Sequence, residues 1–357
     1  MHRRVSLFSA LALALSGALV PAGAAQAEAA NGLDPRPARW TAADSQSERR
    51  TVAQYWTTRR MLAAQPLDSP APRRTQSRGP SEGDPWATRG AAARSSTGTS
   101  RSSNTRGAAW SVGATRPATA ARQAALVPNS PGLLWEDGGA VVRTTGRVFF
   151  TTAQGGNASC SGSAVTSANK SVVITAGHCV KLNGAAHRNW VFVPAFDDGR
   201  RPFGTWVGSR MLTTQQWNAR EDINFDLAAV VVAPLNGRAL TDVVGGQGVA
   251  FNQPRQRQMF AFGYPAADPF DGSKLIYCSG RAFNDTVMTQ DQGVRCNMTG
   301  GSSGGPWFQG FDESTGQGWL NSVNSFTYNF APNFMFGPFF GDEAMAVYQA
   351  AQNTDAL

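Results

Sequence analysis

The chain has 357 residues, of which 41% are hydrophobic and 16% are charged, and its net charge is +8. The positive charge belongs to the first third, because residues 1–130 hold 17 Arg and Lys against 7 Asp and Glu, whereas residues 131–357 hold 15 against 17. A nearly neutral body argues against nucleic-acid binding, which needs a concentrated basic surface. The length allows more than one hydrophobic core.

Residues 1–27 have the pattern of a secretory signal peptide. A basic start at residues 2–4 precedes an apolar run over residues 5–20, and the small residues of AQA (25–27) offer a cleavage site. The apolar run is shorter than the roughly 20 residues that cross a bilayer. We therefore expect a secreted, extracellular protein that has no membrane partner after the signal is removed.

Residues 28–130 predict a pro-segment and a basic linker. The stretch DSQSERRTVAQYWTTRRMLAAQP has the periodicity of one helix, with Trp56 and Met61 on its apolar face. Residues 66–130 are rich in Pro, Ser, Gly and Arg and poor in large aliphatic side chains. Such a composition buries too little apolar surface to offset the entropy of ordering, which predicts a flexible linker.

From about residue 131 the sequence predicts an all-β body. Short apolar or alternating runs such as RVFFTT, SVVITA, LAAVVV and MFAFGYP recur between glycine, asparagine and proline. This spacing is typical of a β-sandwich or barrel. One terminal helix is expected over DEAMAVYQAAQ (342–352).

The four cysteines predict disulfides, because exported proteins meet an oxidising environment. Four cysteines allow three pairings, and the local ones are Cys160 with Cys179 and Cys278 with Cys296. A zinc site is the alternative, but it requires clustered ligands such as C-x-x-C, and the sequence has none.

The segment NMTGGSSGGPW (297–307) contains two adjacent serines among glycines. Read as G-x-S-x-G, it makes Ser302 an α/β-hydrolase nucleophile, whose histidine must follow it in the chain. The three histidines, His2, His178 and His187, all precede it. The alternative is G-x-S-G-G-P with Ser303 as the nucleophile and an upstream base.

Three motifs stand in the order histidine, aspartate, serine: TAGHC at His178, DLA at Asp226 and GGSSGGP at Ser303. Together they resemble the trypsin/chymotrypsin family of serine proteases, in particular its secreted bacterial branch. The resemblance implies two antiparallel six-stranded β-barrels, over residues 131–240 and 241–357, the second carrying the terminal helix. It also implies a serine endopeptidase that acts on proteins or peptides as a monomer and needs no cofactor or metal.

The chemistry of this family implies a role for each residue. His178 would take the proton of Ser303 and later give it to the leaving amine, while Asp226 would hold the imidazole. The backbone N–H groups of Gly301 and Ser303 would stabilise the oxyanion. A disulfide between Cys179 and the strand of Cys160 would fix the base in place.

Three other residues compete for these roles. His187 sits in the polar stretch AAHRNW and is expected to be exposed. Asp222 lacks the strand that should follow the catalytic aspartate, and Ser302 is the alternative nucleophile.

Departures from the family pattern bear on activation and specificity. Ser302 stands where animal members carry an aspartate that pairs with the new N-terminus, so that switch is not expected. Members that cut after Arg or Lys carry an aspartate at the place of Asn297, so a small or medium neutral P1 residue is expected instead. The predicted specificity pocket comprises Asn297, Ser322, Val323, Asn324, Ser325 and Phe326.

The stretch YWTTRRMLAA is similar to pro-regions of secreted actinobacterial proteins, which predicts a precursor whose pro-segment is an inhibitor or a folding chaperone. Cleavage is expected between about residues 106 and 135, and a helix docked through Trp56 and Met61 could cover the cleft. Two alternatives remain open. One is an idle, protease-like binding protein, and the other is a protein that binds anionic wall polymers through its basic N-terminal segment.

Overall fold

The computed structural model describes residues 36–67, 71–72, 79–93 and 130–357. The expected signal peptide and most of the expected cleavage region lie outside the described residues. The all-β expectation with a terminal helix is confirmed, with one closed barrel, a second system of sheets and the helix α6 (Asp342–Gln352).

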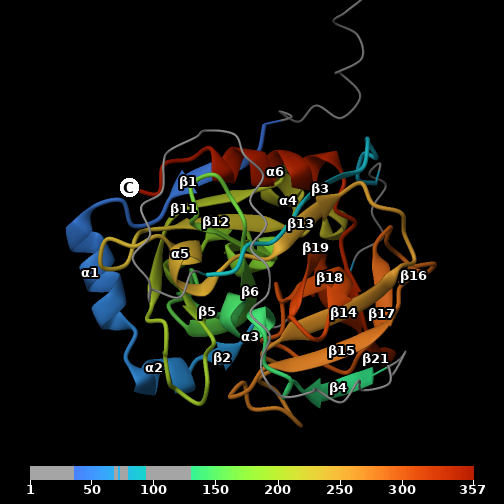
Figure 1. Cartoon of the computed structure of the whole chain (residues 1–357), viewed down its shortest axis with the longest axis horizontal. Coiled ribbons are helices and arrows are strands. Elements are labelled where there is room, and N and C mark those ends of the chain that lie inside the picture. Colours follow the sequence, from blue (N-terminus) through green and yellow to red (C-terminus); the bar gives the residue numbers. More distant parts are fainter. Residues whose placement is uncertain (1–35, 68–70, 73–78, 94–129) are drawn as a thin grey trace, which may run out of the picture. The chain divides into compact units, whose positions relative to one another are not determined.

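Within the described residues, six antiparallel strands close into a barrel in the order β11–β10–β5–β6–β7–β12, with β12 pairing back to β11 (Figure 1). Their bounds are β5 (Thr145–Thr151), β6 (Asn157–Val165), β7 (Val172–Thr175), β10 (Arg188–Pro194), β11 (Trp206–Thr213) and β12 (Ala228–Val232). Valine and phenylalanine side chains of these strands fill the interior. Two N-terminal strands extend this sheet, β1 (Ala38–Thr41) beside β11 and β2 (Gln65–Pro66) beside β6.

The second system combines a seven-stranded and a four-stranded sheet. The first contains β3 (Trp86–Thr88), β4 (Ser130–Leu134), β13 (Gly248–Phe251), β14 (Gln258–Gly263), β15 (Ile276–Arg281), β18 (Pro306–Asp312) and β19 (Gln317–Val323). The second contains β16 (Phe283–Asn284), β17 (Gln292–Arg295), β20 (Phe326–Tyr328) and β21 (Ala331–Gly337). A small hairpin pairs β8 (Lys181–Leu182) with β9 (Ala185–Ala186).

Short helices connect the strands. They are α3 (Ala140–Thr144), α4 (Gln215–Arg220), α5 (Leu240–Val244) and the 3-10 turns η1 (Gly177–Cys179) and η2 (Ile223–Phe225). The terminal helix α6 packs on the barrel, where the hydroxyl of Tyr348 donates to the carbonyl of Thr166 at 2.6 Å.

The expected N-terminal helix is present as two pieces, α1 (Gln46–Tyr55) and α2 (Thr58–Leu62). Ser45 caps the first piece and Thr57 caps the second, so the second cap interrupts the helix. Trp56, between them, donates from Nε1 to the carbonyl of Asn189 in β10 at 2.5 Å. The two helices thus pack on the outside of the barrel.

Residues 79–93 differ locally from the expected flexible linker. Within them β3 pairs with β13, and Trp86 stacks on Phe251 with ring centroids 5.6 Å apart. One large aromatic side chain supplies the buried surface that the average composition of this segment lacks.

Candidate active site

His178 and Asp226 lie side by side because the strands next to them pair. β7 ends at Thr175, shortly before His178, and β12 begins at Ala228, shortly after Asp226, and these two strand residues are partners. Oδ2 of Asp226 lies 2.7 Å from ring Nδ1 of His178, and Oδ1 accepts from the His178 backbone N–H at 2.8 Å. A carboxylate that accepts from Nδ1 orients the ring so that Nε2 points away from it, the arrangement in which Nε2 could act as a base.

A third donor holds the aspartate. The hydroxyl of Ser325 donates to Oδ2 of Asp226 at 2.5 Å. Hydrogen bonds to a charged acceptor are stronger than neutral ones, so three of them fix the carboxylate in a buried site. Ser325, expected in the specificity pocket, is placed by the structure against Asp226.

The loop of Ser303 is linked to the turn of His178 through contacts around the disulfide that joins Cys160 and Cys179. The carbonyl oxygen of Ser303 accepts from the backbone N–H of Ser161 at 2.7 Å and lies 3.6 Å from Sγ of Cys179. Cys179 directly follows His178 and is bonded to Cys160, which directly precedes Ser161. The disulfide therefore ties His178 to the strand that holds the loop of Ser303.

Gly301 and Gly304, on either side of Ser303, occupy positions where a side chain would not fit. Gly304 has φ +77°, and a Cβ there would overlap Oγ1 of Thr175. Gly301 has φ +92°, and a Cβ there would lie 2.9 Å from the carbonyl oxygen of Tyr264. Only glycine accepts such a backbone and such close approach without strain.

A hydrogen bond fixes the orientation of the peptide unit between Gly300 and Gly301 in the loop before Ser303. The backbone N–H of Ala266 donates to the carbonyl of Gly300 at 2.7 Å. Because a peptide unit is planar and trans, the N–H of Gly301 points to the opposite side. The hydroxyl of Ser302 donates to the carbonyl of Thr299 at 2.7 Å, so this loop is braced without a carboxylate at that position.

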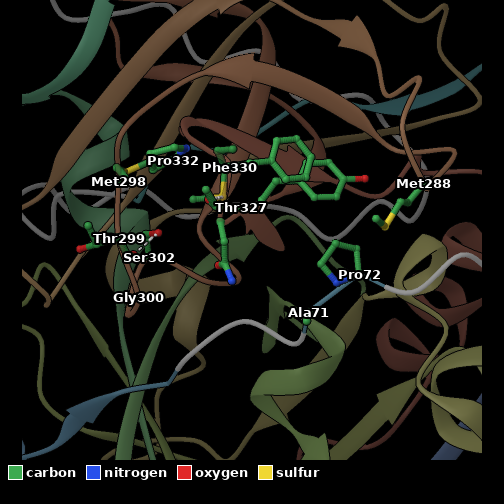
Figure 2. Close-up of a pocket in the computed structure, with 13 residues that line it drawn as sticks. Ala71, Pro72, Met288, Met298, Thr299, Gly300, Ser302, Thr327, Phe330 and Pro332 are labelled. Carbon is green, nitrogen blue, oxygen red and sulfur yellow. Dashed lines mark hydrogen bonds between the residues drawn. The ribbon is translucent and has the colours of Figure 1, made fainter.

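A cavity of about 630 Å³ lies beside the same loop (Figure 2). Among the described residues, its lining has no charged side chain and consists of Ala71, Pro72, Met288, Met298, Thr299, Gly300, Ser302, Thr327, Tyr328, Asn329, Phe330, Pro332 and Met335. An uncharged, largely apolar lining suits an uncharged side chain of a ligand.

The residues expected to form the specificity pocket do not line this cavity. Asn297 Oδ1 accepts from the backbone of Gly132, and Ser322 donates to the carbonyl of Pro338. Asn324 donates to the carbonyls of Phe262 and Ser302 and braces the nucleophile loop. Val323 and Phe326 are buried in the core. The lining comes from residues slightly further along each segment, Met298 after Asn297 and Thr327 after Phe326.

The competing residues have other contacts. His187 is buried, against the expected exposure, because its ring stacks on Phe150 at 4.2 Å and Nε2 lies 2.9 Å from the carbonyl of His178. Burial lowers the pKa of His187 to about 4. Asp222 caps η2 through its bond to Asn224.

The second disulfide, Cys278–Cys296, lies in the second sheet system. Among the described residues, the group of potential metal ligands that lie close together is Cys160, His178 and Cys179, and its two sulfurs are bonded to each other. No helix in the described ranges is long and apolar enough to cross a membrane.

Comparisons with known proteins agree with this geometry. Residues 160–314 match the trypsin-like peptidase domain. The protease Anisep from Arthrobacter nicotinovorans is 43% identical over 63% of this chain and 99% of its own, with a TM-score of 0.57. The thermostable serine protease AL20 from an extremophilic microorganism is 45% identical over 60% of this chain and all of its own, with a TM-score of 0.57. Among curated protein sequences, nothing matches the chain.

Proposed function

The chain belongs to the trypsin/chymotrypsin family of serine endopeptidases, and we propose that His178, Asp226 and Ser303 are its catalytic triad. The observation that carries this proposal is the pair of hydrogen bonds from His178 to Asp226, which orient the ring with Nε2 directed away from the carboxylate. The disulfide neighbour of His178 contacts the Ser303 backbone. These contacts support a nucleophile and base held on one rigid frame.

The reaction then follows the chemistry of the triad. Ser303 Oγ attacks the scissile carbonyl while Nε2 of His178 takes its proton, and the imidazolium is stabilised by Asp226. The N–H groups of Gly301 and Ser303 bind the oxyanion. His178 gives the proton to the leaving amine, and an acyl-enzyme on Ser303 remains, which water hydrolyses by the same steps.

We assign the cavity beside Gly300 to the P1 side chain. Met298 and Met335 contribute flexible apolar surface, and the lining residue Thr327 lies next to Phe326 within β20. Methionines adapt to varied apolar shapes. We expect cleavage after medium or large neutral residues, because the lining residues that the structure describes are uncharged and disfavour Arg, Lys, Asp and Glu.

We further propose that the protein is exported as a precursor and acts outside the cell as a monomer on proteins or peptides. Two disulfides suit an oxidising compartment, and residues 1–27 have the pattern of a signal peptide. The basic segment before residue 131 then serves as a pro-segment. Sequencing the N-terminus of the protein recovered from culture medium tests this proposal.

A serine-reactive organophosphonate tests the catalytic assignment. The full chain is trimmed by limited proteolysis before residue 130, the N-terminal fragment is separated, and the labelled peptide is identified by mass spectrometry. Label on Ser303, lost in Ser303→Ala and retained in Ser302→Ala, supports the proposal. Label on Ser302, or none in a folded and trimmed protein, contradicts it.

A further inference from the structure

A second cavity, of about 500 Å³, shares no described lining residue with the cavity assigned to P1. Its apolar wall includes Trp135, Phe196, Phe203, Tyr264 and Leu275. Phe203 is half-buried, and the other four side chains are buried. A concave site of this size with an apolar wall and a few polar groups is typical of ligand binding.

Cations dominate the charged part of the described lining. Three of them stand against one carboxylate, that of Asp197, and they are Arg143, Arg200 and Lys274. Lys274 Nζ donates to Oδ1 of Asp197 at 2.5 Å, and Oδ2 pairs with Arg200. Arg143 has no carboxylate partner among the described residues, and its guanidinium carbon lies 4.9 Å from the ring centroid of Phe203. The cavity is therefore positive although the body of the protein is nearly neutral.

A fourth cation, Arg147, lies behind the aromatic wall. It is 2% exposed, and its guanidinium carbon lies 5.1 Å from the ring centroid of Phe196. It donates to the carbonyl of Gly272 at 3.1 Å and to Oγ of Ser159 at 2.7 Å, while its Nε has no partner. Burial lowers the pKa of Arg147 to about 10, so the side chain stays protonated at neutral pH. A charge inside a low-dielectric wall is weakly screened and adds to the positive potential of the cavity.

Tyr264 connects the second cavity to the loop of Ser303. Its backbone N–H donates to Oγ of Ser161 at 2.9 Å, and that hydroxyl donates to the carbonyl of Gly301 at 2.9 Å. The backbones also lie close together, since a Cβ on Gly301 would be 2.9 Å from the carbonyl oxygen of Tyr264. A ligand in this cavity therefore contacts a residue that itself contacts the loop of the nucleophile.

We propose that the second cavity is a docking site for protein substrates, and that it binds a segment in which large apolar side chains alternate with acidic ones. The apolar side chain packs on the aromatic wall, and the carboxylates face the cations. The linker of this chain is a poor occupant, because residues 94–129 hold five arginines and no acidic residue. The inference rests on the proposed function and deepens it, because it names a substrate feature that the P1 cavity does not select.

Binding is tested on the full chain with Ser303→Ala, which prevents cleavage of the probe. The probe is the fluorescent octapeptide Gly-Asp-Phe-Glu-Glu-Phe-Asp-Gly, and its affinity is measured by fluorescence polarisation. Arg143→Gln combined with Lys274→Gln should weaken binding at least tenfold. Lys170→Gln combined with Arg281→Gln removes the same charge at exposed residues outside the cavity and should weaken binding less than threefold.

A second peptide with serine in place of both phenylalanines separates docking from simple attraction between charges. We expect it to bind at least tenfold more weakly than the first. Equal affinities of the two peptides, or equal losses in the two double variants, would overturn the proposal. Absence of binding to a chain that unfolds cooperatively would overturn it as well.

The role in substrate selection is tested on the trimmed protein. Internally quenched peptides with a neutral P1 residue carry the acidic octapeptide at one end or the other, through ten Gly and Ser residues that span roughly 16–19 Å. Tethering should lower KM at least fivefold in one of the two orders, with kcat unchanged. This gain should vanish when Arg143→Gln and Lys274→Gln are combined.

Phosphonate labelling of Ser303, measured in parallel, distinguishes the two ways in which this experiment can fail. If the label is absent, the proposed triad is wrong. If the label is present and KM falls in neither order, the triad stands and the docking site is wrong.

Discussion

The hydroxyl of Ser325 donates to Oδ2 of Asp226 at 2.5 Å. This is the oxygen that faces Nδ1 of His178, the proposed base. Asn324 and Ser325 are the two residues that follow the end of β19. The side chain of Asn324 donates to the carbonyl of Ser302 and so holds the loop that contains Ser303. This short stretch of the second sheet system thus orients both Asp226 and the loop that contains Ser303.

Ser325→Ala is expected to lower kcat/KM by roughly tenfold to a hundredfold, since a hydrogen bond to a charged group contributes about 1.5–3 kcal/mol. The loss should fall mainly on kcat, because Ser325 positions the aspartate and does not line the cavity. Ser322→Ala is the matched control, because that hydroxyl bonds to Pro338 instead. A Ser325→Ala enzyme with unchanged kcat would show that Asp226 needs no third donor.

Ser303→Ala, His178→Ala and Asp226→Asn are each expected to reduce turnover by several orders of magnitude while thermal unfolding changes little. Because these residues act as a unit, a double variant should lose little beyond the worst single one. Steady-state kinetics on the trimmed protein measure this. Additive losses in the double variant would contradict a shared mechanism.

The proposed triad has a signal in the sequence at each member, because each residue adjoins a recognisable strand or turn. His178 ends an apolar β run, Asp226 opens one, and Ser303 sits among glycines that a tight turn requires. The order of the three motifs then excluded the α/β-hydrolase alternative. These signals are local, and strand pairing converts them into a site.

The cavity could not be predicted in the same way, because its lining depends on the register of β20 and β21. A shift of one or two positions decides whether Phe326 or Thr327 faces it, since side chains alternate along a strand. The position of the N-terminal helices was also beyond sequence reasoning. Trp56 gives an apolar face, but which surface of the body receives it depends on tertiary complementarity with Phe149 and β10.

If the cavity binds the P1 side chain, substitutions at the neighbouring residues Met298 and Asn297 should change P1 preference to different extents. Met298→Asp introduces a carboxylate into the lining and is expected to shift P1 preference toward Arg and Lys by at least tenfold relative to leucine. Asn297→Asp should change the preference by less than threefold, because that side chain faces the backbone of Gly132. A peptide-library cleavage profile measures both. The reverse result would place the base of the pocket at Asn297.

The disulfide beside His178 is expected to stabilise both the fold and the proposed site. Replacing Cys160 and Cys179 together by alanine should cost about 3 kcal/mol of unfolding free energy, as loop-closure entropy predicts for a loop of this size. The kcat of the folded variant should also fall, because Cys179 adjoins His178 and the disulfide holds that residue in position. The double replacement of Cys278 and Cys296 is the comparison, since it should lower stability with a smaller effect on kcat. Equal activity losses in the two pairs would count against a positioning role.

His187 makes stability depend on pH. Its folded-state pKa of about 4 lies below the ordinary value, so the unfolded chain binds a proton first as the pH falls. Its stabilisation is therefore full above about pH 6.5 and is lost progressively toward pH 4, by on the order of 3 kcal/mol. His187→Gln keeps a donor for the carbonyl of His178 but cannot titrate in this range. Denaturant unfolding in a Ser303→Ala background, which prevents self-digestion, should show a smaller loss of stability between pH 7 and pH 4.5 for the glutamine variant than for its parent. If both proteins lose the same stability over that interval, the buried histidine is not the group responsible.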